Sequence, residues 1–337
     1  MAEPERIQRV ALTELVVQAF EASGVARGNA EAVARALVAA EIDGHSGHGL
    51  SRIGDYAAQA RTGKVAGHAR PEVVRTAPGW LSVDAAHGFA YPALEAALAE
   101  LAPLAREQSV AGAAVRRSHH CGQLGAQVER LAEDGLVALM VSNTPRAMAA
   151  WGGREPLFGT NPIAFAAPRP GDAPLVVDLS LSKVARGKVM AAKKAGEPIP
   201  EGIALDADGR STTDPDAALA GTMVPVGEAK GAALALMVEV LAVTLTGATP
   251  SREASSFFEA DGPAPGVGHL ILAFDPACTP EPGFGAGIDA LVAAMTSETG
   301  VRLPGSRRIK ARAQAEAKGV AVPAHLLAEI RALAGED

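Results

Sequence analysis

Residues 110–142 constrain the fold more than any other stretch of the chain. The small apolar residues of Val110–Val115 predict a strand, the spacing in Gln123–Asp134 predicts a helix, and Leu136–Ser142 predicts a second strand. A strand, a loop, a helix and a strand within about 30 residues are typical of a βαβ-type unit. We therefore predict a fold of the α/β class, in which ligands bind beyond the ends of the strands.

Apolar spacing predicts further elements on both sides of this unit. Asn29 is a candidate cap of the second helix, and Pro103 brings a risk of a break in the fourth. Pro198–Asp216 is polar and turn-rich, and it is predicted to form a β-hairpin or a surface excursion. The predicted helices are 7–22, 32–41, 53–60, 91–106, 231–245, 288–296 and 324–334. Val73–Val83 is predicted to form one or two short strands broken at Pro78-Gly79, and the further strands are Leu175–Asp178 and His269–Asp275.

Composition excludes several classes of function. The chain of 337 residues has a net charge of −7 and no long basic run, which argues against nucleic acid as a partner but permits a small anionic ligand. The apolar run Leu234–Val243 is interrupted by Glu239 and is too short to span a bilayer. With two cysteines, no Cys-x-x-Cys pair and no recognisable signal peptide, a reducing cytoplasm is the expected location.

The ten residues Asp43–Arg52 combine an acid, two histidines, two serines, three glycines and an arginine. Glycine lets the backbone approach a ligand closely, histidine moves protons near neutral pH, and arginine presents a planar fork to a carboxylate. This combination indicates a site that binds and protonates a small acid. A plain helix stop and turn is the structural alternative, and the spacing of His45 and His48 also fits a weak metal site.

A second candidate site, Arg116–Gly125, lies where a predicted strand gives way to a predicted helix. Backbone amides at a helix N-terminus attract anions, and the two glycines allow a phosphate to approach. The structural alternative is a strand–helix turn whose histidines, His119 and His120, are hydrogen-bonded locally. Cys121 is disfavoured as a nucleophile because no paired base and carboxylate motif accompanies it.

Three further candidates each have a plain structural alternative. Thr160, in the tight loop Pro156–Pro162, can hydrogen-bond a carboxylate or simply belong to a turn. Asp178, at a strand end, can meet a ribose hydroxyl or cap a helix. Lys230, before a long helix, can meet a phosphate or stay solvated. The standard Gly-x-Gly-x-x-Gly and P-loop motifs are absent, and Gly283–Gly287 is the nearest match.

Taken in order, these stretches resemble the malate/L-lactate dehydrogenase family, which is unrelated to the Rossmann-type lactate dehydrogenases. Its branches include ureidoglycolate dehydrogenase, sulfolactate dehydrogenase and the piperideine-2-carboxylate/pyrroline-2-carboxylate reductases. The resemblance runs from the first predicted helix to Arg308. The motifs that carry it are His48-Gly49-Leu50-Ser51-Arg52, Ser118-His119-His120, Gly159-Thr160-Asn161-Pro162, Asp178-Leu179-Ser180, Gly187-Lys188, Asp214-Pro215, Lys230-Gly231 and Leu303-Pro304-Gly305.

The resemblance implies a three-layer, non-Rossmann NAD(P)-binding sheet domain with helical N-terminal and C-terminal segments packed against it. The segment 1–75 would carry the substrate-binding and catalytic stretch. An NAD(P)-binding α/β domain would span 76–300, with its core at 110–250, and 301–337 would return to the N-terminal part. The resemblance also implies a homodimer, with the active site between the cofactor domain and the rest of the chain.

The same resemblance implies hydride transfer between NAD(P)H and the 2-carbon of a small 2-oxo or 2-hydroxy acid, or of a cyclic 2-imino acid. His48 and His120 match catalytic positions, while the expected substrate contacts are Arg52, Thr160, Ser46 and Lys188. Arg307 and Arg308 slightly favour NADP, because arginine can meet a 2′-phosphate, and no metal is expected. The positions that match cofactor contacts are Cys121, Gly122, Gln123, Leu124, Gly125, Thr144, Asp178, Leu179, Ser180, Lys230, Pro304, Gly305 and Ser306.

Two departures from the family pattern bear on the substrate. The family usually has Ser-His-Gly, whereas here Gly47 precedes His48 and Ser46 lies one place earlier. The imino-acid reductases carry an aspartate at the position of Lys188, which resembles the hydroxy-acid branch, whereas Asp43-Gly44 and Pro156–Ala166 resemble the reductases more closely. Two other classes stay open. One is a metal-dependent hydrolase or lyase that uses clustered histidines, and the other is an inactive relative that binds a small acid.

Overall fold

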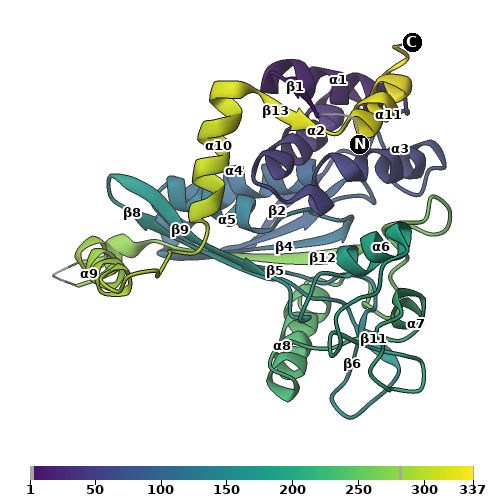
Figure 1. Ribbon diagram of the computed structural model, residues 1–337. Helices are drawn as coiled ribbons and strands as arrows, with labels where there is room; N and C mark the ends of the chain where they lie inside the picture. The colour runs from purple at the N-terminus through teal and green to yellow at the C-terminus, as the bar shows by residue number, and fades with distance from the viewer. Residues whose placement is uncertain (1–3, 281–282, 337) are drawn as a thin grey trace.

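A seven-stranded sheet forms the centre of the molecule (Figure 1). The computed structural model describes residues 4–280 and 283–336. The strands lie in the order β2-β3-β4-β12-β5-β8-β9, and β3–β4 is parallel while the other pairs are antiparallel. Their bounds are β2 Glu72–Ala77, β3 Trp80–Asp84, β4 Val110–Ser118, β5 Val137–Ser142, β8 Ile163–Arg169, β9 Asp172–Leu179 and β12 Val267–Phe274.

The predicted βαβ-type unit consists of β4, helix α5 (Gly125–Glu133) and β5. Its two strands are not neighbours, because β12 lies between them and runs antiparallel to both. Ile271 of β12 is paired with Ala113 on one side and Met140 on the other. The apolar pattern of β12 predicted a strand but gave no information about its partners.

Helices cover one face of the sheet. Ala113, Met140 and Ile271 point into an apolar cluster shared with α4 (Ala90–Gln108) and α5, whereas the next residue along each strand points to the opposite face. This is the two-residue period of a strand that is buried on both sides. Pro103 lies within α4 without ending it, so the helix is longer than the predicted 91–106.

The opposite face is covered by α8 and a set of smaller elements (Figure 1). The helix predicted over 231–245 is α8, which runs as an α-helix and then a π-helical turn over Val240–Thr244. The predicted hairpin at Pro198–Asp216 supplies β10, but its partner β11 lies beyond that range. The bounds are α6 Arg186–Ala195, α7 Pro215–Ala220, α8 Ala229–Glu239, β6 Met148–Ala149, β7 Pro156–Phe158, β10 Ala204–Leu205 and β11 Thr222–Met223.

The N-terminal and C-terminal segments pack together above the helices α4 and α5 (Figure 1). Strand β1 (Glu5–Ile7) pairs with β13 (Val320–Val322), so the two segments share a small sheet. Val322, Leu327 and Ile330 join an apolar cluster with residues of the first three helices, including Leu12 and Phe20. The helices are α1 Arg9–Glu21, α2 Arg27–Ile42, α3 Ile53–Arg61, α10 Ser306–Lys318 and α11 Ala324–Ala334, and α9 (Phe284–Thr296) lies at the far edge beside β8.

These layers confirm the predicted α/β class and the three-layer arrangement, while the domain boundaries stay a prediction. The expected role of Asn29 is wrong: α2 begins at Arg27, and the Asn29 amide donates instead to the carbonyls of Gly67 and Ala69, at 2.9 Å each. Helix α10 was not predicted, because it is strongly polar and buries only Arg308. In the described residues, no helix is long and apolar enough to cross a membrane.

Ion pairs join α10 to the rest of the molecule. The Arg312 guanidinium donates to both carboxylate oxygens of Asp43, at 2.6 and 2.8 Å, and to both of Glu129, at 3.0 and 2.7 Å. Asp43 ends α2 and Glu129 belongs to α5, and both carboxylates are buried. The polar helix α10 is therefore held in place by charge, next to the Asp43–Arg52 stretch.

Candidate active site

A buried histidine on β12 aligns the ends of the three central strands. The two ring nitrogens of His269 are hydrogen-bonded to the hydroxyls of Ser142, at 2.8 Å, and Ser118, at 2.9 Å. These serines are the last residues of β5 and β4. Burial lowers the pKa of His269 to about 4, so the ring is neutral at pH 7 and carries one proton for two partners.

The two histidines that follow β4 have different hydrogen-bond partners. The Nδ1 atom of His120 is hydrogen-bonded to the Tyr56 hydroxyl from α3, and its ring stacks on His48 at 5.3 Å between ring centroids. His119 is hydrogen-bonded through Nε2 to the Gln59 side-chain oxygen, at 2.8 Å. His48 and His120, which are far apart in the sequence, therefore form one imidazole pair.

Arg52 lies beside this pair and is only 7% exposed. Its Nε donates to the carbonyl of Gly47 at 2.7 Å, and its guanidinium carbon lies 4.3 Å from the centroid of the Phe258 ring. The terminal nitrogen NH1 is buried without a hydrogen-bond partner among the described residues, and its nearest carboxylate oxygen, on Asp55, is 3.9 Å away. A buried guanidinium with a free donor is suited to bind a carboxylate.

Burial keeps the imidazole pair neutral. It lowers the pKa of His48 to about 4, with further contributions from the positive charge of Arg52 and from His45, and it holds the pKa of His120 well below its usual value. Burial also raises the pKa of Tyr56, so its hydroxyl stays protonated at pH 7 while it is hydrogen-bonded to His120 Nδ1. Which of these two atoms donates is decided by the tautomer of the His120 ring, and Nε2 is the ring nitrogen left for a substrate.

Three segments that match cofactor-binding positions meet around the N-terminus of α5. The backbone amide of Gly125 donates to the Asp178 carboxylate at 2.7 Å, and a side chain at Gly125 would start only 3.0 Å from that carboxylate. Gln123 donates to Asp43 at 3.1 Å. Gly305, at a φ of +80°, precedes α10 and lies beside the backbone of Val176 on β9, next to Asp178.

A second group of predicted residues lies across the end of β5. The Thr144 hydroxyl accepts from the Thr160 amide at 2.9 Å and lies 3.3 Å from the Thr160 hydroxyl. The amide of Leu181 donates to the Thr160 carbonyl, and the amide of Val226 donates to the Leu181 carbonyl, both at 2.8 Å. The segments that hold Thr144, Thr160, Ser180 and Lys230 therefore run side by side.

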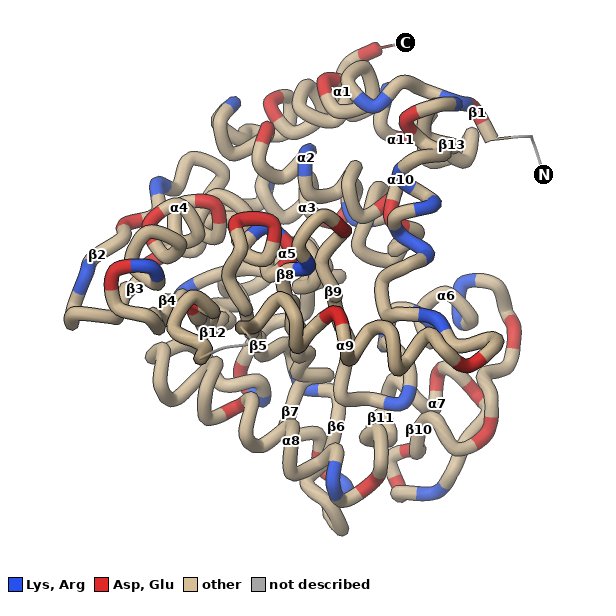
Figure 2. Tube along the Cα trace, turned by 90° about the vertical axis from the view of Figure 1, so that its left-hand side faces the viewer, with Lys and Arg blue, Asp and Glu red and all other residues tan. Residues whose placement is uncertain are grey.

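Several predicted residues stand apart from these groups. Ser46 is exposed, and its carbonyl accepts from the Ser51 hydroxyl. Lys188 and Lys230 are exposed on α6 and α8. Arg308 is buried against Glu129 and Asp43, so it is not the exposed partner for a 2′-phosphate that the sequence suggested, and Arg307 is the exposed one. The positive charges along α10 are visible in Figure 2.

Two of the alternative chemistries lack support at this site. Burial raises the pKa of the Cys121 thiol to about 12, which leaves it unreactive as a nucleophile. Within residues 4–280 and 283–336, no three His, Cys, Asp or Glu side chains converge as a metal site would require.

Sequence reasoning missed the residues that surround the imidazole pair. Tyr56 lies four residues after Arg52 in a predicted helix, which is the spacing of one helical face, and the chain has only two tyrosines. Phe257 and Phe258 are adjacent aromatics in a polar loop of a chain with 4% aromatic residues. These were the available signals, whereas nothing in the pattern of β12 distinguished His269 from an ordinary strand residue.

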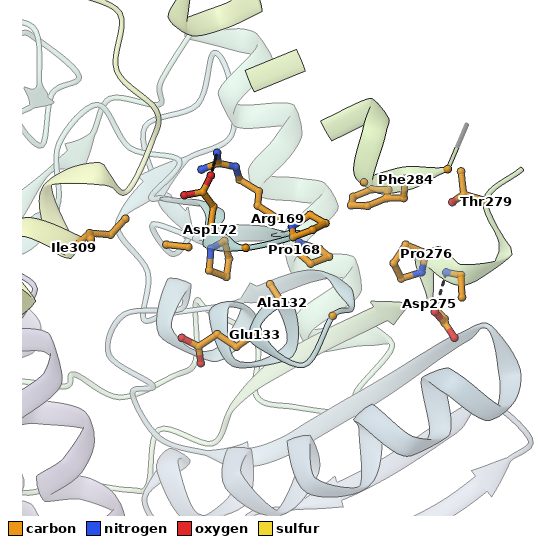
Figure 3. A pocket seen from close by; sticks show the side chains of 18 residues that line it. Ala132, Glu133, Pro168, Arg169, Asp172, Asp275, Pro276, Thr279, Phe284 and Ile309 are labelled. Atoms are coloured by element: carbon orange, nitrogen blue, oxygen red, sulfur yellow. Dashed lines mark hydrogen bonds and ion pairs between the residues drawn. The ribbon is translucent and has the colours of Figure 1, made fainter. Parts of the chain in front are cut away.

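A cavity of about 1100 Å³ lies elsewhere, between the C-terminal end of α5, the β8–β9 turn and the start of α9 (Figure 3). Its lining includes Glu133, Arg169, Asp172 and Phe284, and none of the predicted site residues borders it. Arg169 is paired with Asp172 at 2.8 Å within this wall. The cavity is therefore separate from the histidine–arginine site.

The sequence model of the malate/L-lactate dehydrogenase family matches residues 7–331. The chain is 57% identical to a (2R)-3-sulfolactate dehydrogenase (NADP(+)) from Chromohalobacter salexigens, over 95% of each chain. It is 40% identical to a Δ1-pyrroline-2-carboxylate reductase from Ancylobacter novellus, over 99% of this chain and 98% of the other. The crystal structure of Δ1-piperideine-2-carboxylate reductase from Pseudomonas syringae superimposes with a TM-score of 0.93 at 38% identity, covering 98% of this chain and 99% of the other.

The chain belongs to the malate/L-lactate dehydrogenase family. The predicted family is confirmed, and so is the predicted class of enzyme, an oxidoreductase that transfers hydride to or from a small acid. The two alternatives, a metal-dependent hydrolase or lyase and an inactive relative, are not favoured. The roles of individual residues stay predictions.

We expect His269 to make stability depend on pH. Below about pH 6.5 the unfolded chain protonates this histidine, whereas the folded protein, with a pKa of about 4, does not, so stability falls as the pH falls through this window. Between pH 6.5 and 4.5, the free energy of unfolding measured with urea should fall less steeply for His269→Gln than for the wild type, by about 1 kcal/mol per pH unit. His325→Gln, on the surface of α11, is the control, and equal slopes for both variants would contradict the assignment.

We expect Arg52 to hold the substrate carboxylate. A charge-assisted pair of this kind contributes about 1.5–3 kcal/mol, so Arg52→Met should raise KM by about 10- to 150-fold. Steady-state kinetics with the preferred acid, beside Arg61→Met at the end of the same helix, would measure this. An unchanged KM for Arg52→Met would remove the residue from the substrate site.

Proposed function

We propose that the protein is an NADP-dependent dehydrogenase of a small 2-hydroxy acid that carries a second anionic group, with (2R)-3-sulfolactate as the leading substrate. The observation that carries the acid class is Arg52, whose free nitrogen is buried beside the His48–His120 pair. The relative at 57% identity supports the particular acid and the preference for NADP. Lys188, which stands where the imino-acid reductases carry an aspartate and is exposed on α6, is the residue that we propose for the second anionic group.

The residues around α5 fit a dinucleotide. A Cβ at Gly125 would crowd the Asp178 carboxylate that accepts from the Gly125 amide, and the Gln123 side-chain oxygen is buried without a partner among the described residues. Cys121–Gly125, Asp178–Ser180 and Pro304–Ser306 would hold the cofactor there. When bound, the nicotinamide supplies or accepts the hydride.

The side chains of this protein bind, orient and protonate. Arg52 fixes the substrate carboxylate, which positions the 2-carbon beside the imidazole pair. In the reductive direction His120 takes up a second proton together with the acid, and its Nε2 donates one proton to the oxygen at the 2-carbon, which leaves a neutral ring with its remaining proton on Nδ1, facing the Tyr56 hydroxyl. His48 stacks on His120 and keeps water away from it. In the oxidative direction His120 takes the proton back.

A second candidate function is reduction of a cyclic 2-imino acid. It is supported by the relatives of about 40% identity and by the superposition on a piperideine-2-carboxylate reductase. It requires the same carboxylate contact at Arg52, and it differs in the group that is protonated, a ring nitrogen instead of an oxygen. Gly47 and Lys188 are the departures that weigh against it.

A substrate panel separates the two functions. We expect reduction of NADP⁺ with (2R)-3-sulfolactate to exceed that with malate or lactate, and Lys188→Met to raise KM for sulfolactate more than for lactate. NADPH oxidation with pyrroline-2-carboxylate and piperideine-2-carboxylate is measured in parallel, by absorbance. Turnover of the cyclic imino acids alone would replace the first proposed function with the second. No turnover of any hydroxy acid or imino acid in the panel would contradict both.

We also propose that the protein acts as a homodimer in the cytoplasm. Apart from Lys230 and Glu239 near its ends, helix α8 is apolar on all sides. It exposes Leu236 by 52% and Met237 by 44%, and Val240, in the π-helical turn that follows, is exposed by 49%. A helix that is apolar all round is normally buried on all sides, and a second copy of the chain supplies a self-complementary cover. Both cysteines are free thiols, which suits a reducing compartment.

We expect Leu236→Lys combined with Val240→Glu to convert the dimer to a monomer, because charges would then face the apolar surface of the second copy. Light scattering coupled to size-exclusion chromatography measures the mass. Leu291→Lys, at an equally exposed leucine of α9, is the matched control and should stay dimeric. A wild-type monomer, or a dimer unaffected by the double substitution, would contradict the proposed interface.

A further inference from the structure

The loop segment Ser256–Asp261 forms a wall of the histidine–arginine site. The Phe257 ring lies 4.9 Å from the ring of His120 and 5.5 Å from that of His119. The Phe258 ring lies 4.3 Å from the guanidinium carbon of Arg52, on which it forms a cation–π contact. Two adjacent aromatic side chains of one loop therefore touch both a predicted catalytic residue and the predicted carboxylate-binding residue.

Side chains from the end of α3 hold the backbone of this segment. Gln59 donates to the carbonyls of Phe257, at 3.0 Å, and Glu259, at 2.9 Å, and Thr62 donates to that of Ala260 at 2.8 Å. Gln59 also bonds His119, so one amide links the loop to the site histidines. The segment has no regular secondary structure, and its carbonyls are paired by residues nearly 200 positions away in the sequence.

Lys64 is the centre of this attachment. It is 3% exposed, and its ammonium donates to the carbonyls of Ser256, Glu259 and Asp261 at 2.7, 2.8 and 3.1 Å. An ammonium has three N–H donors, and all three are used on the same short loop. Burial lowers the pKa of Lys64, and the nearby carboxylates of Glu259 and Asp261 oppose that shift. A neutral replacement would leave the carbonyls of Ser256 and Asp261 without a donor, while the Glu259 carbonyl would keep the Gln59 amide.

We propose that Lys64 is a positioning residue, which clamps Ser256–Asp261 so that Phe257 and Phe258 set the size of the acid that fits beside Arg52. The proposal rests on the function proposed above, because it requires the substrate carboxylate at Arg52. Phe258 covers one face of the Arg52 guanidinium, and the Gly47 carbonyl accepts from its Nε. The substrate carboxylate therefore approaches the terminal nitrogens of this side chain. The carbons beyond the carboxylate then meet the two aromatic rings.

The test is Lys64→Met, with Lys310→Met on exposed α10 as the matched control. Kinetics are measured with the acid that the wild type prefers and with homologues longer by one and two methylenes. We expect KM for the preferred acid to rise by about 10- to 100-fold, preference for the shorter acid to weaken and KM for NADP to stay unchanged. Loss of kcat at an unchanged length preference would overturn the proposal.

A measurement without turnover separates this proposal from the proposed function. Hydrogen exchange of the segment 257–261 should accelerate at least tenfold in Lys64→Met, while α3 and β12 keep wild-type rates. If exchange accelerates in Lys64→Met but the wild-type protein turns over no acid, the positioning role of Lys64 is supported and the proposed function is rejected. Unchanged exchange would reject the clamp, whatever the activity.

Two further variants keep the proposal testable if Lys64→Met does not fold. Phe258→Ala should relax the length preference while Lys64 is intact, and an unchanged preference would overturn the assignment of the wall. In Lys64→Ala, n-propylammonium should lower the raised KM part of the way back to the wild-type value, because it occupies the place of the missing ammonium. The bulkier tetramethylammonium should not lower KM. Equal effects of the two ions would also count against the clamp.

Discussion

The two hydrogen bonds of the His269 imidazole determine where the central strands end. A neutral ring has one donor and one acceptor, and here both are used between the serines that close β4 and β5. The loops that begin immediately after these serines carry His119, His120 and Thr144. Because the ring is fully buried, neither serine has water as an alternative partner, so the three strand ends are fixed relative to one another.

The electrostatic character of the site follows from burial of positive charge. Arg52 and Lys64 are both buried, and neither forms a close ion pair with a carboxylate, since Arg52 lies 3.9 Å from Asp55 and Lys64 bonds to carbonyls. Burial of their own rings, and then these positive charges, lower the pKa of the neighbouring histidines His48 and His119 and keep both rings neutral. In the proposed reaction an arriving carboxylate offsets the charge of Arg52, which makes a proton on His48 or His120 less costly. Binding of the acid and uptake of a proton would then be coupled.

The sequence was sufficient for the layers of the fold and for most of its long elements. Apolar spacing predicted α4, α8 and α11, and the predicted βαβ-type unit is present. Each of these segments buries a continuous apolar face, and the spacing of the apolar residues shows whether that face has the period of a helix or of a strand. Spacing contains no information about pairing, so the insertion of β12 between β4 and β5 was not foreseen. Helix α10 was not predicted from the sequence, because ion pairs of Arg312, and not an apolar stripe, hold it in place.

The candidate site was predictable in its motifs but not in its surroundings. His48, Arg52 and His120 stand in glycine-rich or histidine-rich stretches that attract attention in a sequence. Tyr56, Lys64 and Phe258 stand in an ordinary helix end and an ordinary loop, and their importance comes from contacts between segments nearly 200 residues apart. A tyrosine that bonds an imidazole nitrogen and a lysine that bonds three carbonyls have no sequence signature, because each partner is a ring or a backbone in another part of the chain.

The pairing of β1 with β13 has a consequence for synthesis on the ribosome. The apolar cluster of α1, α2 and α3 is completed only by Val320, Val322, Leu327 and Ile330. At about 5–20 residues per second, these residues emerge tens of seconds after the stretch Asp43–Arg52. During that interval the part of the cluster that these residues cover in the folded protein lacks its cover, so the N-terminal helices reach their final packing only after synthesis of the C-terminal segment.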